Sequence, residues 1–105
     1  MESEPKTLAS LTAEDFRPLL GQPFTLELGP AQSLEVPLID VTETPRYRAP
    51  KATRCPFSIT LRLPAGAPVP QGILGLRHPD LGRLEVFFVD VGPDELGRCF
   101  QAVFS

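Results

Sequence analysis

The sequence has few of the residues that build metal and redox sites: two cysteines, Cys55 and Cys99, and one histidine, His78. A structural zinc site takes four Cys or His ligands, usually in closely spaced pairs, and no CxxC pair occurs here. We therefore expect no zinc and no cofactor. A disulfide between Cys55 and Cys99 would need neighbouring strands, and in a reducing cytosol we expect two small, half-buried thiols instead.

Other binding chemistries also lack their usual patterns. The thirteen acidic residues show no calcium-binding spacing, and the turn-rich PAGAPVPQG lacks the lysine and the following helix that cradle a nucleotide. The net charge of −3 disfavours nucleic acid and anionic membrane, which both attract a positive surface. No apolar run approaches the roughly 20 residues that cross a bilayer. The chain starts with acidic and polar residues, unlike a secretion signal, so we expect a cytoplasmic protein.

Proline and glycine, by contrast, are abundant. Thirteen prolines and eight glycines separate short apolar runs and form no repeat, which is typical of a β domain with many turns. At 105 residues, with 42% apolar and 22% charged residues, the chain suits one domain with one core. We expect a flexible leader over residues 1–9 and a single β domain over residues 10–105.

The first structured element is predicted to be a short helix. Thr12 is a good N-cap, Asp15 occupies the third helical position of a capping box, and Pro18 interrupts the helix before Gly21. The helix is therefore limited to one or two turns. Its apolar side chains are Phe16, Leu19 and Leu20.

Alternation of apolar and polar residues then predicts strands. Residues 24–28 and 34–38 form a first hairpin around a Gly-Pro turn. The apolar parity slips between Leu38 and Ile39, which predicts a bulge or an edge there. Residues 42–56 have no periodicity and are predicted to form the longest loop.

The rest of the chain predicts four more strands. Residues 57–63 alternate strictly, and residues 73–77, 84–91 and 99–104 form a three-strand meander separated by turn residues. The sequence thus predicts a mainly β fold of about six short antiparallel strands in a small open barrel or a sandwich. One short N-terminal helix is expected to plug one end or to cover one face.

The meander is apolar on both faces. If Leu84, Val86 and Phe88 face the core, alternation turns Phe87 and Val89 to the other side. The residues that join them there are Ile73, Val91 and Val103. Burying such side chains is worth about 1.5 to 3 kcal/mol each, so a cover is expected. We expect the helix to provide it; the alternative is another chain, which would make Phe87 and Val89 contacts with an unknown protein partner or with a second copy in a dimer.

Residues 46–54 carry four cations and one aromatic residue without an acid. Such a segment could grip a phosphate, an acidic protein or single-stranded nucleic acid, whereas the plainer interpretation is a solvated loop. Because of the net negative charge, we expect a protein partner and no nucleic acid. The candidate contacts are Arg46, Tyr47, Arg48, Lys51 and Arg54.

His78 is the obvious candidate for general acid–base chemistry, with Asp80 two residues away. Pro79 presets a turn and Asp80 can bond its own backbone, so a structural turn explains the same residues. No motif around either cysteine supports a nucleophile paired with this histidine. We expect a turn here and no catalytic residue.

Three motifs occur in a fixed order, namely Pro70-Gln71-Gly72, His78-Pro79 with Leu81-Gly82, and the ending Ala102-Val103-Phe104. Together with LTAEDFRPLLGQPFTL and PFSITLRLP, they resemble an uncharacterised family of short bacterial proteins, a domain of unknown function, over residues 8–105. The resemblance implies a bacterial source, a small β domain and an accessory role in a phage-tail-like system. It brings no activity, cofactor or catalytic residue.

These observations favour a non-enzymatic interaction or assembly module, because the chain has an apolar face and a basic loop but no convergent set of reactive groups. Two alternatives remain open. One is a small-ligand-binding β-barrel, which needs an internal pocket of a few hundred cubic ångströms. The other is an enzyme that uses His78.

Overall fold

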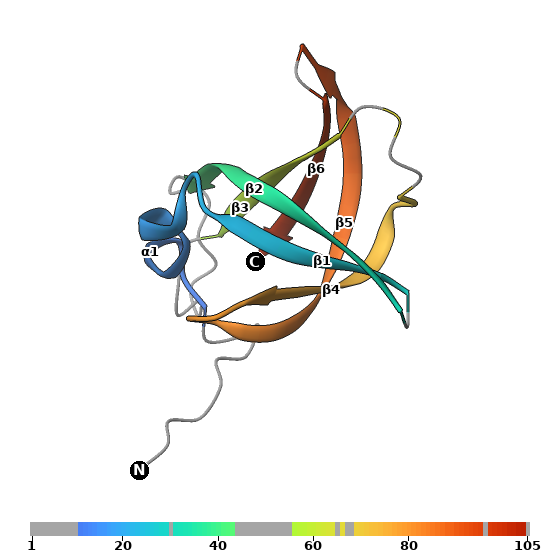
Figure 1. Ribbon diagram of the computed structural model, residues 1–105. Helices are drawn as coiled ribbons and strands as arrows, with labels where there is room; N and C mark the ends of the chain where they lie inside the picture. Colours follow the sequence, from blue (N-terminus) through green and yellow to red (C-terminus); the bar gives the residue numbers. More distant parts are fainter. Residues whose placement is uncertain are drawn as a thin grey trace.

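The computed structural model describes residues 11–29, 31–43, 56–64, 66, 69–95 and 97–104. Over these residues, six antiparallel strands form a closed barrel with a short helix at one end (Figure 1). The elements are α1 (Ala13–Phe16), the 3₁₀ turn η1 (Arg17–Leu19), β1 (Pro23–Gly29), β2 (Gln32–Glu43), β3 (Phe57–Leu63), β4 (Gly72–His78), β5 (Gly82–Asp94) and β6 (Gly97–Phe104). The predicted mainly β fold of six antiparallel strands with one short helix is confirmed. Of the open barrel and the sandwich that the sequence predicted, the chain adopts a barrel, and this barrel is closed.

The barrel consists of two three-stranded meanders that meet along two seams. The strand order is β1-β2-β3-β6-β5-β4, so β1 pairs with β4 and β3 pairs with β6. The middle strand of each meander is long: β2 pairs with β1 and then with β3, and β5 pairs with β4 and then with β6. A register shift between Leu38 and Asp40 confirms the predicted bulge, and a second shift lies between Asp90 and Pro93. Such bulges let a strand bend from one half of a barrel into the other.

The alternating residues of the strands fill the inside of the barrel. Phe57, Ile59, Leu61 and Leu63 of β3 are all fully buried, as their spacing predicts. The inward residues of β5 are also buried, and Phe88 among them is fully buried. Further fully buried side chains are Phe24, Leu26, Val36, Leu38, Leu76 and Phe100. Large side chains from all six strands therefore meet in one core.

The helix plugs one end of this barrel. Thr12 and Asp15 form the predicted capping box, in which the Thr12 backbone N–H donates to Asp15 Oδ2 at 2.9 Å. The Phe16 ring centroid lies 6.3 Å from Phe24, 5.8 Å from Phe57 and 5.6 Å from Phe104. One helical side chain thus joins the ends of β1, β3 and β6.

The expectation that the helix covers the outer face of the meander is wrong. Phe16 and Leu19 are buried at the end of the barrel, and Leu20 stays 46% exposed. The helix is too short to reach further, because its α-helical part has four residues and Pro18 lies in the 3₁₀ turn that follows. The outer face of β4, β5 and β6 is consequently left without this cover.

The loop predicted for residues 42–56 starts later than expected. Thr42 and Glu43 still belong to β2, where they pair with Ser58 and Phe57. The polar character of Thr42 concealed this extension, since an outward position on a strand accepts polar residues. Residues 44–55, with all five candidate contacts of the basic loop, lie outside the described residues, as does the leader predicted for residues 1–9.

Candidate functional site

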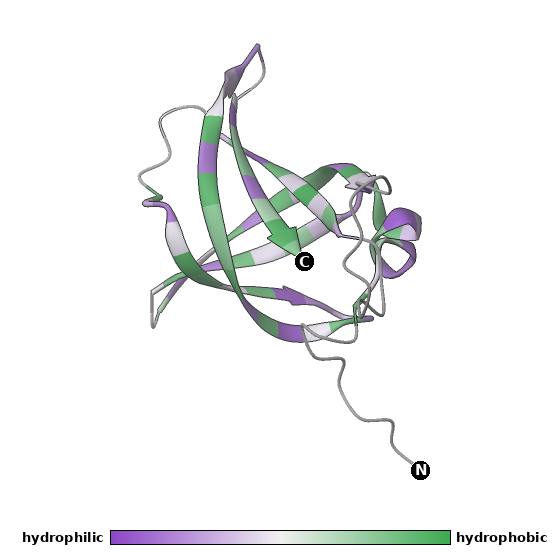
Figure 2. Ribbon diagram, turned by 180° about the vertical axis from the view of Figure 1, so that it is seen from behind, coloured by the Kyte–Doolittle hydropathy of each residue, from purple (hydrophilic) through white to green (hydrophobic). Residues whose placement is uncertain are grey.

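Five exposed or half-exposed apolar side chains lie on the outside of β4, β5 and β6. We call them the outer apolar face: Ile73, Phe87, Val89, Val91 and Val103. Ile73 is 70% exposed, Phe87 58% and Val103 66%. The predicted facing of these residues is confirmed, since Leu84, Val86 and Phe88 between them point into the core. Figure 2 shows an uninterrupted hydrophobic stretch along the middle of the long, bent β5, where residues that face the core and residues that face outward are both apolar.

Strand register makes this face continuous. Ile73 lies directly opposite Phe87 across the β4–β5 pair, and Val89 lies opposite Gln101, two residues before Val103. Residues two apart on a strand point to the same side, so these side chains occupy adjoining positions on three neighbouring strands. β-branched and aromatic residues also suit the strands that carry them. A contiguous set of exposed apolar side chains of this kind is typical of a contact site.

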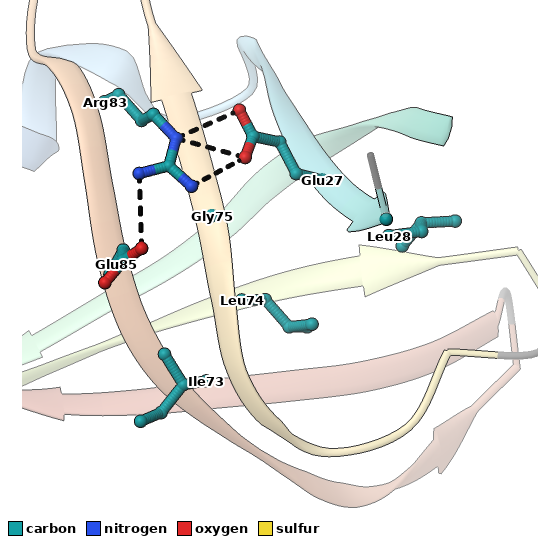
Figure 3. A pocket seen from close by; sticks show the side chains of 8 residues that line it. Glu27, Leu28, Ile73, Leu74, Gly75, Arg83 and Glu85 are labelled. Carbon is teal, nitrogen blue, oxygen red and sulfur yellow. Dashed lines mark hydrogen bonds and ion pairs between the residues drawn. The ribbon is translucent and has the colours of Figure 1, made fainter. Parts of the chain in front are cut away.

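A network of charged side chains borders the face on the side of β1. Glu27 of β1 accepts hydrogen bonds from Arg83 Nη2 at 2.9 Å and from Arg83 Nε at 3.1 Å, and Arg77 Nε lies 2.9 Å from its other oxygen. Arg83 Nη1 also donates to Glu85 at 3.4 Å (Figure 3). The hydrogen bonds from Arg83, followed by the positive charges of Arg83 and Arg77, lower the pKa of Glu27 below its ordinary value.

The lowered pKa of Glu27 predicts a change in acid stability. The folded state favours the charged carboxylate, so its contribution to stability is fully present above the ordinary value of 4.5 and is lost as the pH falls through the folded-state pKa. In Glu27→Gln this loss should be absent, so its free energy of unfolding should fall less steeply below pH 4.5 than that of the wild type. Urea unfolding across this pH range measures both slopes. Parallel slopes would show that the Glu27 network does not stabilise the fold.

Beside the network lies a hollow at the β1–β4 seam, with Gly75 among its lining residues. β1 and β4 pair only over Thr25–Glu27 and Gly75–Arg77, and beyond these residues the strands diverge. The hollow has a volume of 340 Å³, and Figure 3 shows the residues around it. They are Glu27, Leu28, Gly29, Ile73, Leu74, Gly75, Arg83 and Glu85.

Only glycine fits at position 75 with the network in place. A Cβ there would overlap Glu27 Oε1 and would approach Arg83 Nη2 to 2.9 Å.

The sequence analysis predicted neither the hollow nor the network. Glu27 and Arg83 are far apart in the chain, and the pairing of β1 with β4 adds Glu27 to the sheet that β4 and β5 form with Arg83. Ile73 lines the hollow and also belongs to the outer apolar face.

His78 is held by a turn and by the core. The Asp80 backbone N–H donates to Nδ1 at 3.0 Å, so the ring proton lies on Nε2, which donates to Gln22 Oε1 at 3.0 Å. The His78 ring also packs on Phe24, with 4.7 Å between the centroids, and the side chain is buried. Both nitrogens therefore have structural partners, as the turn interpretation of this motif requires.

Cys99 is buried in β6 and carries a free thiol. Burial raises its pKa, and the negative charge of Asp94 acts in the same direction. A thiol with a raised pKa is a poor nucleophile, because the thiolate is the reactive form. Cys55 lies outside the described residues.

Within the described part of the chain, no three or more His, Cys, Asp or Glu side chains are grouped so that they could hold a metal ion. In the same residues, no helix has the length and apolar character that crossing a membrane requires.

Fold and surface together define a small, closed, antiparallel β-barrel with one uncovered apolar face. The chain belongs to the family described as Domain of unknown function (DUF6916), whose model matches residues 11–104. This confirms the resemblance to an uncharacterised family. No curated protein and no solved structure matches the chain.

Proposed function

We propose that this barrel is a non-enzymatic protein-interaction or assembly module that binds its partner through the outer apolar face. The observation that carries the proposal is the exposure of Ile73, Phe87 and Val103 on three adjacent strands. A protein partner would bury these side chains, and the burial of each is worth about 1.5 to 3 kcal/mol. The basic residues between Arg46 and Arg54 are proposed as an additional polar contact.

The packing inside the barrel favours this function over ligand binding. The interior positions hold large, fully buried side chains, including Phe24, Phe88 and Phe100. Hollows of 340, 350 and 400 Å³ are lined by described residues, and each opens to solvent at the surface of the barrel. A ligand-binding barrel encloses its ligand instead.

The surroundings of His78 favour a module over an enzyme. Its two nitrogens bond to Asp80 and Gln22, so using it as a base would cost one of these bonds. The resemblance noted in the sequence suggests the setting of the module. We place it in the bacterial cytoplasm, as an accessory of a phage-tail-like system.

Site-specific photo-cross-linking in the native cell tests the contact surface. A benzophenone side chain replaces Phe87 or Val103 in two variants, and in the control it replaces Glu35, an exposed residue of β2. The proposal expects a defined protein adduct from both positions of the face and none from the control. Adducts of equal yield from all three positions, or from Glu35 alone, would show that the face is not the contact surface.

A further inference from the structure

The outer apolar face carries a protruding side chain next to an empty space of suitable size. Phe87 projects from β5 and is more than half exposed. The hollow beside Gly75 lies two residues further along the β4–β5 pair, since Phe87 is opposite Ile73 and Glu85 is opposite Gly75. We propose that the partner of this face is a second copy of the chain, with Phe87 of each protomer inserted into the Gly75 hollow of the other. This inference rests on the proposed function and names its partner.

The hollow fits an aromatic ring in size and in chemistry. A cavity of about 150 Å³ is enough to hold benzene, and the hollow measures 340 Å³. Leu28, Ile73 and Leu74 provide an apolar wall. The guanidinium of Arg83 lies on the other side, where a phenyl face would gain a cation–π contact.

Symmetry allows both insertions at once. Phe87 and the hollow lie on neighbouring strands of the same surface. A two-fold axis that passes midway between them, in the plane of the contact, therefore brings Phe87 of each protomer to the hollow of the other. In such an isologous dimer, residue i contacts residue j and residue j contacts residue i. The assembly therefore closes at two copies, with two equal contacts.

The charges around the hollow suit a second copy of this chain. The border contains Arg77 and Arg83 together with Glu27 and Glu85, and these side chains neutralise one another. A partner of strong single-sign charge would meet no complementary field, whereas an identical border brings equal numbers of both signs. A standard interface buries about 800 Å² on each partner, so the apolar face forms its centre and polar neighbours such as Gln101 form its rim.

Two variants with complementary defects test the insertion. Phe87→Ser removes the inserted side chain and keeps the hollow. Gly75→Val keeps Phe87 and is designed to close the hollow, because its side chain takes the place of the Glu27 carboxylate and pushes that group and the Arg83 guanidinium aside. Sedimentation equilibrium should show a wild-type dimer, and each variant alone should dissociate at least about 100-fold more readily, because both rings leave the interface. An equimolar mixture should form a heterodimer with one of the two contacts, which native mass spectrometry identifies by its mass. Glu35→Gln, at an exposed position of β2 outside both the face and the hollow, is the control and should stay dimeric.

The outcomes separate this inference from the proposed function. A monomeric wild type, a dimeric Phe87→Ser variant or a mixture without heterodimer would each overturn reciprocal insertion. A monomeric wild type whose position 87 still cross-links to a different protein would overturn the dimer and support the interaction module. If Gly75→Val does not fold, Gly75→Ala replaces it, since its Cβ displaces the same Glu27 carboxylate with a smaller side chain.

Discussion

Phe16→Ala is expected to lower the free energy of unfolding by about 3 to 5 kcal/mol, the range for a large aromatic side chain removed from a core. Phe16 is fully buried and touches the rings of Phe24, Phe57 and Phe104. Its removal would leave a cavity among residues of three different strands, which cannot all close around it. Urea unfolding followed by circular dichroism gives the change.

Leu20→Ala is the matched control for this variant. Leu20 follows the same helical segment, but its side chain is 46% exposed, so the change should stay within about 0.5 kcal/mol of wild type. If both variants were equally stable, the helix would not be the plug that closes the barrel.

Gly97→Ala is expected to destabilise the fold by about 3 kcal/mol or more, at the upper end of the range for overpacking. A Cβ on Gly97 would overlap the carbonyl oxygen of Leu63 and come within 3.3 Å of its carbonyl carbon. These are backbone atoms of β3, a strand held on both sides by β2 and β6. The neighbour cannot rotate away as a side chain would, so the strands themselves must separate.

Gly29→Ala provides the comparison at another strand end. Nothing lies within 4 Å of a Cβ at Gly29, so alanine should be neutral or should stabilise by less than about 1 kcal/mol. Thermal unfolding of the two variants side by side measures the difference. A Gly97→Ala protein as stable as Gly29→Ala would mean that β3 and β6 are further apart than described.

Much of the fold could be predicted because its strands have regular alternation. Residues 57–63 and 84–88 gave the correct facing from period two alone, and the parity slip before Ile39 located a bulge. The facing of Phe87 follows from the same rule, so the outer apolar face was accessible from the sequence.

The seam between β1 and β4 could not be predicted in the same way. Alternation tells which side of a strand Glu27 faces, but not which strand lies next to it. The Glu27–Arg83 pair and the need for glycine at position 75 both depend on that neighbour. The helix was placed on the wrong surface for a related reason, since the apolar spacing of Phe16 and Leu19 fits the end of a barrel as well as its side.

The order of the strands has a consequence for how the chain folds. Each meander joins strands that follow one another in sequence, so β1–β2 and β4–β5–β6 can pair by short-range search. The two seams instead join residues far apart in the chain, such as Phe57 with Phe104, and closing loops of that length costs entropy before contacts form. The stacked rings of Phe57 and Phe104 lie on one of these seams and under the Phe16 plug. The β3–β6 seam and the aromatic cluster are therefore expected to form together, because the same long-range contacts hold both.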